Sequence, residues 1–126
     1  MQRKTSNSGA SQHLPELMQL RHVRSVAHQY DIDLQGVSIK IERDANLINT
    51  GICGVANHEH SGKGRIHLLP DAFSSEEELA RTLFHEKMHL EQFITHGYDN
   101  VSSDYARFEK ETRQAEDKFW KGRHKE

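Results

Sequence analysis

Residues 74–97 read SSEEELARTLFHEKMHLEQFITHG and carry the clearest structural pattern of the chain. The serines can cap the free backbone N–H groups of a helix. The next three residues are glutamates, whose negative charge is favourable at the positive end of the helix dipole. Apolar side chains then recur at helical spacing: Leu79, Leu83, Leu90 and Phe93. Gly97 is typical of the residue that ends a helix. The stretch therefore predicts one long amphipathic helix that ends at about His96.

This helix contains the pattern His-Glu-x-x-His, formed by His85, Glu86 and His89. Residues four apart lie on nearly the same face of a helix, about 6 Å apart along its axis, so both imidazoles can bind one zinc ion. Glu86 falls within the apolar stripe, where a carboxylate is costly unless a partner or a function holds it there. Beside a metal it can accept a proton from water and pass it to a leaving group. The pattern predicts a catalytic zinc site with Glu86 as the general base.

A catalytic zinc site normally has three protein ligands and one open position, so a further ligand is needed. A last helix is marked by an apolar period: Tyr105, Phe108, Ala115 and Phe119. It carries Glu109 and Glu116 on one flank of the apolar stripe and Glu111 on the other, so a helical-wheel projection does not identify which of them is the ligand. His96 lies two turns beyond His89, too far along a straight helix. We expect the third ligand to be one of these glutamates.

The rest of the chain predicts a small sheet and one more helix. Alternation over residues 37–42 indicates a strand, and residues 51–56 and 65–69 resemble further strands joined by a polar turn. Residues 14–30 have a helical period, whereas Asp99, Asn100, Ser102 and Ser103 indicate a polar loop after the active-site helix. With 126 residues, the chain fits one α+β domain over residues 13–126, preceded by a flexible leader over residues 1–12.

Composition excludes several classes of protein. A net charge of −2 gives no overall attraction to nucleic acid or to anionic membranes, so neither is expected as a partner. No stretch approaches the roughly 20 apolar residues of a membrane span, and the N-terminus lacks the apolar core of a signal peptide. The single cysteine, Cys53, cannot form an internal disulfide and is predicted to be a buried hydrophobe rather than a nucleophile. His58 and His60 flank Glu59 in the polar turn and are predicted to be exposed.

Residues 66–73, 78–92 and 108–111 together resemble the zincin-like metallopeptidase toxin domains at the C-termini of bacterial polymorphic toxins, including contact-dependent growth inhibition proteins. The resemblance implies a zincin-like fold in which a small sheet accompanies the active-site helix and a C-terminal helix carries a ligand. It implies Zn²⁺ held by His85, His89 and, in the gluzincin manner, Glu111, with Glu86 as the catalytic base. It also implies delivery into the cytoplasm of a target cell and a cognate immunity protein as partner.

We therefore expect a zinc metallopeptidase that hydrolyses a protein or peptide substrate. The alternatives are a metal-dependent nuclease toxin and a non-catalytic module in which the zinc is structural. Strand 65–69 is expected to be an edge strand that can pair with an extended substrate. Tyr105 could donate a hydrogen bond to a developing oxyanion, but its period places it in the core. Phe119 and Trp120 are expected to be packing residues at the end of the last helix.

Overall fold

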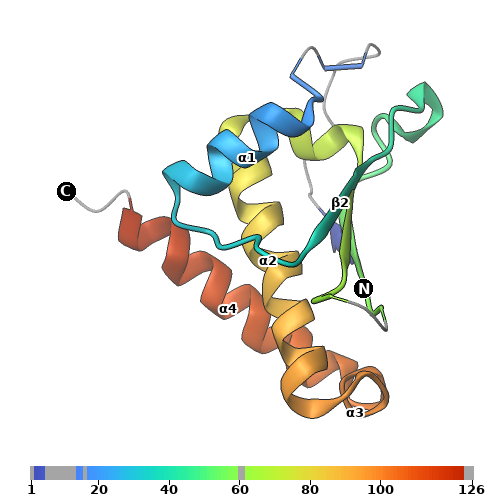
Figure 1. Ribbon diagram of the computed structural model, residues 1–126, viewed down its shortest axis with the longest axis vertical. Helices are drawn as coiled ribbons and strands as arrows, with labels where there is room; N and C mark the ends of the chain where they lie inside the picture. Colours follow the sequence, from blue (N-terminus) through green and yellow to red (C-terminus); the bar gives the residue numbers. More distant parts are fainter. Residues whose placement is uncertain (1, 5–13, 16, 60–61, 124–126) are drawn as a thin grey trace.

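The computed structural model describes residues 2–4, 14–15, 17–59 and 62–123, and it has an α+β fold (Figure 1). Four strands form one sheet in the order β1-β3-β4-β2. The elements are, in chain order, β1 (Gln2–Lys4), α1 (Leu20–Gln29), β2 (Ser38–Ile41), β3 (Ile52–Asn57), β4 (Arg65–Leu68), α2 (Glu76–His96), α3 (Tyr98–Ser103) and α4 (Tyr105–Arg123), with short 3-10 helices at Ala45–Leu47 and Pro70–Phe73. Helix α2 contacts the sheet, chiefly β3, and also packs against α1 and α4. It is therefore the central element of the fold.

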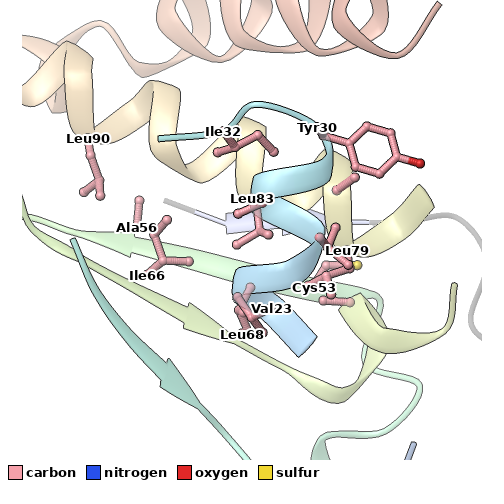
Figure 2. Close-up of a cluster of buried hydrophobic side chains, with 14 of the residues drawn as sticks. Val23, Tyr30, Ile32, Cys53, Ala56, Ile66, Leu68, Leu79, Leu83 and Leu90 are labelled. Carbon is pink, nitrogen blue, oxygen red and sulfur yellow. The ribbon is translucent and has the colours of Figure 1, made fainter. Parts of the chain in front are cut away.

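Helix α2 confirms the prediction from residues 74–97. The Ser75 side chain caps its start by accepting a hydrogen bond from the Glu78 backbone N–H at 3.0 Å. At its end, Gly97 has a φ of 85°, a left-handed conformation that glycine adopts without strain. The apolar stripe is fully buried against residues of the sheet and of α1, and Figure 2 shows Leu79, Leu83, Leu90, Ile66, Leu68, Cys53, Ala56 and Val23 in this cluster. Burial of this stripe fixes which face of α2 points to the sheet.

The three predicted strands are present, but their order corrects one expectation. Strand β4 pairs antiparallel with β3 on one side and parallel with β2 on the other. The prediction that residues 65–69 form an edge strand is therefore wrong, because β2 occupies the second edge of β4. The edges of the sheet are β1 and β2.

Three other local predictions also change. Residues 98–103, expected to be a loop, form the short helix α3, and the Asn100 side chain donates a hydrogen bond to the His96 carbonyl at 2.7 Å. Helix α1 begins at Leu20 and is shorter than the period over residues 14–30 suggested. Residues 2–4 of the expected flexible leader form β1, whereas the remainder of that leader lies outside the described residues. The short polar segment gains its structure from pairing with β3, which requires no apolar pattern.

Strand β3 approaches α2 closely at Gly54. A Cβ atom at this position would lie 2.7 Å from Thr82 Cγ2 and 3.2 Å from Glu86 Cγ. Glycine therefore allows the backbone of β3 to lie directly against the segment of α2 that carries the His-Glu-x-x-His pattern.

Within the described ranges, no helix combines the length and the apolar character needed to cross a membrane.

Candidate metal centre

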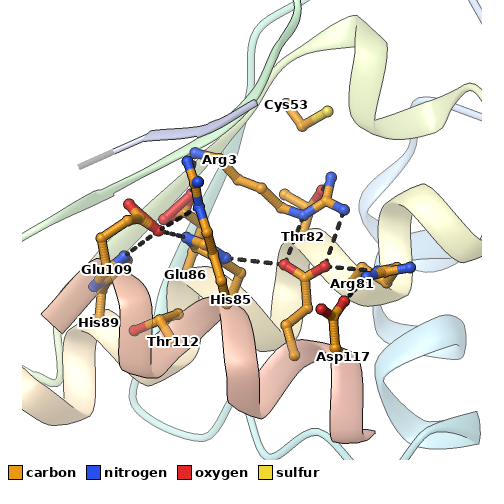
Figure 3. A network of polar contacts seen from close by, with 12 residues as sticks. Arg3, Cys53, Arg81, Thr82, His85, Glu86, His89, Glu109, Thr112 and Asp117 are labelled. Atoms are coloured by element: carbon orange, nitrogen blue, oxygen red, sulfur yellow. Dashed lines mark hydrogen bonds and ion pairs between the residues drawn. The ribbon is translucent and has the colours of Figure 1, made fainter. Parts of the chain in front are cut away.

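His85 and His89 on α2 and Glu109 on α4 bring three possible metal ligands together (Figure 3). One ligand atom from each residue lies within 4.8 Å of the others. Glu109 Oε1 is 2.7 Å from His85 Nε2 and 3.6 Å from His89 Nε2. All three side chains are buried. Two helices that are separate in sequence thus build one compact group of nitrogen and oxygen donors.

Buried polar atoms without hydrogen-bond partners indicate whether a metal would fit this group. In the part of the chain that the structure describes, four buried side-chain atoms have no hydrogen-bond partner: His85 Nε2, His89 Nε2, Glu109 Oε1 and Glu86 Oε1. The short separation of His85 Nε2 from Glu109 Oε1 lacks the alignment of a hydrogen bond. Buried polar atoms without partners are costly, and here four are neighbours in one site. A divalent cation bound by the two imidazoles and Glu109 fits this arrangement.

The other ring nitrogen of each histidine is held by a hydrogen bond. His85 Nδ1 is 2.9 Å from Glu116 Oε1, and His89 Nδ1 is 2.9 Å from Gln92 Oε1. Because both partner atoms are acceptors, each ring donates a proton from Nδ1, so that Nε2 is the nitrogen that would offer its lone pair to a metal. Such partners orient the histidines of metal sites. Glu116, which the sequence left open as a ligand, is therefore assigned to the positioning of His85.

Glu116 belongs to a buried ionic network that joins α4 to the rest of the site. It accepts hydrogen bonds from Arg3 Nε at 3.0 Å, from Arg3 Nη2 at 3.2 Å and from Arg81 Nε at 2.6 Å. Burial alone would raise the pKa of Glu116, but the hydrogen bonds from His85 and Arg3 lower it to about 2. The carboxylate thus remains ionised and can hold the Nδ1 proton of His85.

Glu86 lies beside the ligand group and is fully buried. Its Oε2 accepts a hydrogen bond from the Arg3 backbone N–H at 3.1 Å, whereas its Oε1 has no hydrogen-bond partner within the described ranges. Burial raises the pKa of Glu86 to about 8, against the opposing effect of His85. A carboxyl group with a pKa in the neutral range can both accept and release a proton, as a general acid and base must.

The structure does not bring Glu111 into the group. Phe108, Glu109, Thr112 and Glu116 are the buried residues of α4, and their spacing defines the face that packs toward α2. Glu111 lies off this face and is exposed. Glu109 thus takes the place that the resemblance gave to Glu111. His96, which the helical rise disfavoured, is also exposed.

The prediction that Tyr105 belongs to the core is wrong, because its side chain is 40% exposed at the first turn of α4. Its hydroxyl instead donates a hydrogen bond to Glu109 Oε2. This contact occupies one oxygen of Glu109 and leaves the other, Oε1, facing the two histidines. Tyr105 therefore orients Glu109.

Cys53 lies in β3 with no exposed surface, as predicted for a structural residue. Burial raises the pKa of its thiol to about 12, so the nucleophilic thiolate is strongly disfavoured. His58 is exposed and stacks on Tyr98. His60 lies outside the described residues.

Sequence reasoning missed two residues that complete the site. Gln92 stands three residues after His89 on the same face of α2, a spacing that could have indicated its contact with the histidine. Arg3 offered no comparable signal, because it lies in a short polar segment far from the motif in sequence. Comparisons of the chain with family models, with curated proteins and with solved structures found no match.

Proposed function

We propose that this protein is a zinc-dependent metallopeptidase with a zincin-like arrangement of its active-site helix and ligand-bearing C-terminal helix. One observation carries the proposal: buried atoms of His85, His89, Glu109 and Glu86 lie in one site and lack hydrogen-bond partners among the described residues. Two imidazoles and one carboxylate are a common ligand set of catalytic zinc, which keeps a position open for water or substrate. The alternative of a closed structural site would require a fourth protein ligand, and among the described residues the group contains three.

The roles of the side chains follow from their contacts. His85, His89 and Glu109 would hold the metal, while Glu116, Gln92 and Tyr105 hold these ligands in place. When bound, zinc would polarise the substrate carbonyl and lower the pKa of water. Glu86 would take the proton from the attacking water and deliver it to the leaving nitrogen. Its burial, with a pKa raised to about 8, supports both transfers at neutral pH.

The first experiment is to measure zinc per chain by elemental analysis on protein purified without chelator. We expect about one zinc in the parent and none in a His85→Ala/His89→Ala variant. Glu109→Ala and Glu111→Ala form a matched pair, because both remove a glutamate from α4 and only Glu109 belongs to the group. Loss of zinc in Glu109→Ala alone would support the assignment. Parent protein that binds no zinc when it is supplied would refute it.

Catalysis is tested with Glu86→Gln, which keeps the size of the side chain and removes its basicity. We expect this variant to retain zinc and to lose cleavage of a mixed peptide library, monitored by mass spectrometry. An active Glu86→Gln protein would refute the mechanism. Degradation of RNA or DNA by the purified parent, without peptide cleavage, would favour the nuclease alternative.

We extend the proposal to biology through the resemblance to bacterial toxin domains. The chain would act in the cytoplasm of a target cell after delivery, and an immunity protein would neutralise it in the producing cell. Induced expression inside a bacterium should then arrest growth with the parent and not with Glu86→Gln. Equal growth arrest by both would argue that toxicity, if any, does not come from hydrolysis.

A further inference from the structure

Strand β1 lies along the outer edge of β3, the strand that packs most closely against α2. The two strands are antiparallel, with Gln2 opposite Val55 and Arg3 opposite Gly54. Where Arg3 faces Gly54, its backbone N–H donates to Glu86 Oε2 at 3.1 Å. An extended peptide backbone thus already runs along the sheet edge with an amide directed at the proposed general base (Figure 3).

The Arg3 side chain enters a buried acidic subsite formed by Glu78, Thr82 and Glu116. Its Nη1 donates to Glu78 Oε2 at 2.8 Å and to Thr82 Oγ1 at 3.2 Å. Its Nε and Nη2 bind the two oxygens of Glu116 at 3.0 and 3.2 Å. Only 8% of the side chain is exposed. This bidentate geometry matches the planar guanidinium, and the single ammonium of lysine cannot reproduce it.

We propose that β1 occupies the peptide-binding edge of the active site, and that Glu78, Thr82 and Glu116 form a subsite that selects arginine in an extended peptide substrate. Backbone pairing with a sheet edge is a general mode of peptide recognition. Glu86, fully buried with Oε1 lacking a hydrogen-bond partner beside this backbone, marks the edge as part of the site. A peptide that pairs with β3 in this register has to replace β1.

The position of the amide also specifies which bond is hydrolysed, and this step rests on the proposed function. The nitrogen beside Glu86 belongs to the arginine itself, so the arginine contributes the leaving amine. Water would add its oxygen to the carbonyl carbon of the preceding residue, the C–N bond would break, and Glu86 would carry the proton to the arginine nitrogen. Cleavage is therefore expected on the amino side of arginine.

Binding can be tested without metal or catalysis in an Arg3→Ala variant of the full chain, which empties the subsite and removes the side-chain bonds that hold β1 beside it. The probe is a fluorescent, acetylated Gln-Arg-Lys-Thr peptide, and its matched control replaces the arginine by lysine. We expect the arginine peptide to bind the variant at least about ten-fold more tightly than the lysine peptide, since the fork of hydrogen bonds is lost with lysine. Equal binding of both peptides, or no binding to folded Arg3→Ala protein, would overturn the proposal.

Two further variants separate the subsite from general acidity. In the Arg3→Ala background, Glu78→Gln should weaken binding of the arginine peptide. Glu77→Gln should leave this binding unchanged, because Glu77 contacts Arg81 rather than the subsite. If Arg3→Ala does not fold, zinc-loaded parent protein is incubated with peptides that contain one arginine or one lysine. Preferred cleavage before arginine supports the proposal, and cleavage without that preference overturns it.

The outcomes distinguish this inference from the proposed function. Arginine-selective binding by a protein that binds no zinc would support the proposed peptide site and refute the proposed peptidase activity. Zinc binding and Glu86-dependent cleavage with no preference for arginine would retain the peptidase and remove the subsite.

Discussion

Replacing Gln92 by leucine tests whether the hydrogen bonds behind the histidines matter for metal binding. Gln92 Oε1 is 2.9 Å from His89 Nδ1, and Gln92 Nε2 donates to Thr112 Oγ1 at 2.9 Å. Leucine is similar in size but cannot accept a hydrogen bond from His89 Nδ1. Thr112 keeps its own hydrogen bond to the Phe108 carbonyl at 2.8 Å, so the histidine is the main group left without a partner.

The size of the effect follows from that lost contact. A buried donor without its partner costs about 1–3 kcal/mol. Loss of an outer hydrogen bond to a metal-binding histidine typically weakens metal affinity by about 10- to 100-fold, which corresponds to about 1.4–2.7 kcal/mol. The two ranges overlap, and we expect the zinc affinity of Gln92→Leu to fall by that factor.

The assay is competition for zinc with a chromophoric chelator at neutral pH, on protein shown to be folded by circular dichroism. Gln114→Leu, an identical change on the exposed face of α4, is the control and should leave affinity unchanged. An unchanged zinc affinity in folded Gln92→Leu would refute the reasoning that Gln92 positions His89.

Three further predictions concern the protein scaffold. Gly54→Ala should lower the free energy of unfolding by about 1–3 kcal/mol in urea titrations, because the new Cβ would lie 2.7 Å from Thr82 Cγ2. Gly122→Ala, whose Cβ would meet no described atom within 4 Å beyond its chain neighbours and its own helix backbone, should stay within about 1 kcal/mol of the parent, and an equal loss in both variants would contradict the close-contact argument. Leu83→Ala should cost about 2–5 kcal/mol in the same titration, since Leu83 is fully buried, and a loss below 1 kcal/mol would show that the site collapses around the smaller side chain. Burial raises the pKa of Cys53 to about 12, so near pH 8 only about one thiol in ten thousand is ionised. We therefore expect a thiol reagent to react with Cys53 only after unfolding in concentrated guanidinium chloride. Rapid reaction of the native protein would show that β3 opens.

Local patterns of the sequence were sufficient for α2, for the three strands with apolar residues and for the pairing of His85 with His89. Each depends on spacing within one element, where helical or strand geometry converts sequence distance directly into spatial distance. The burial of Glu86 could be predicted for the same reason, because its position on the wheel follows from the apolar residues around it.

The remaining parts of the site depend on how segments that are distant in sequence pack together. Glu109 and Glu111 both lie on α4, and the choice between them depends on how that helix is rotated against α2, which the period of a short amphipathic helix leaves open. Arg3 reaches Glu78 and Glu116 across 75 and 113 positions of sequence. Its strand is held by backbone pairing and buried ion pairs, and neither produces a periodic apolar signal. Local patterns were therefore enough to predict the helix that carries His85, Glu86 and His89, whereas the positions of Glu109 and of β1 depend on packing between distant segments.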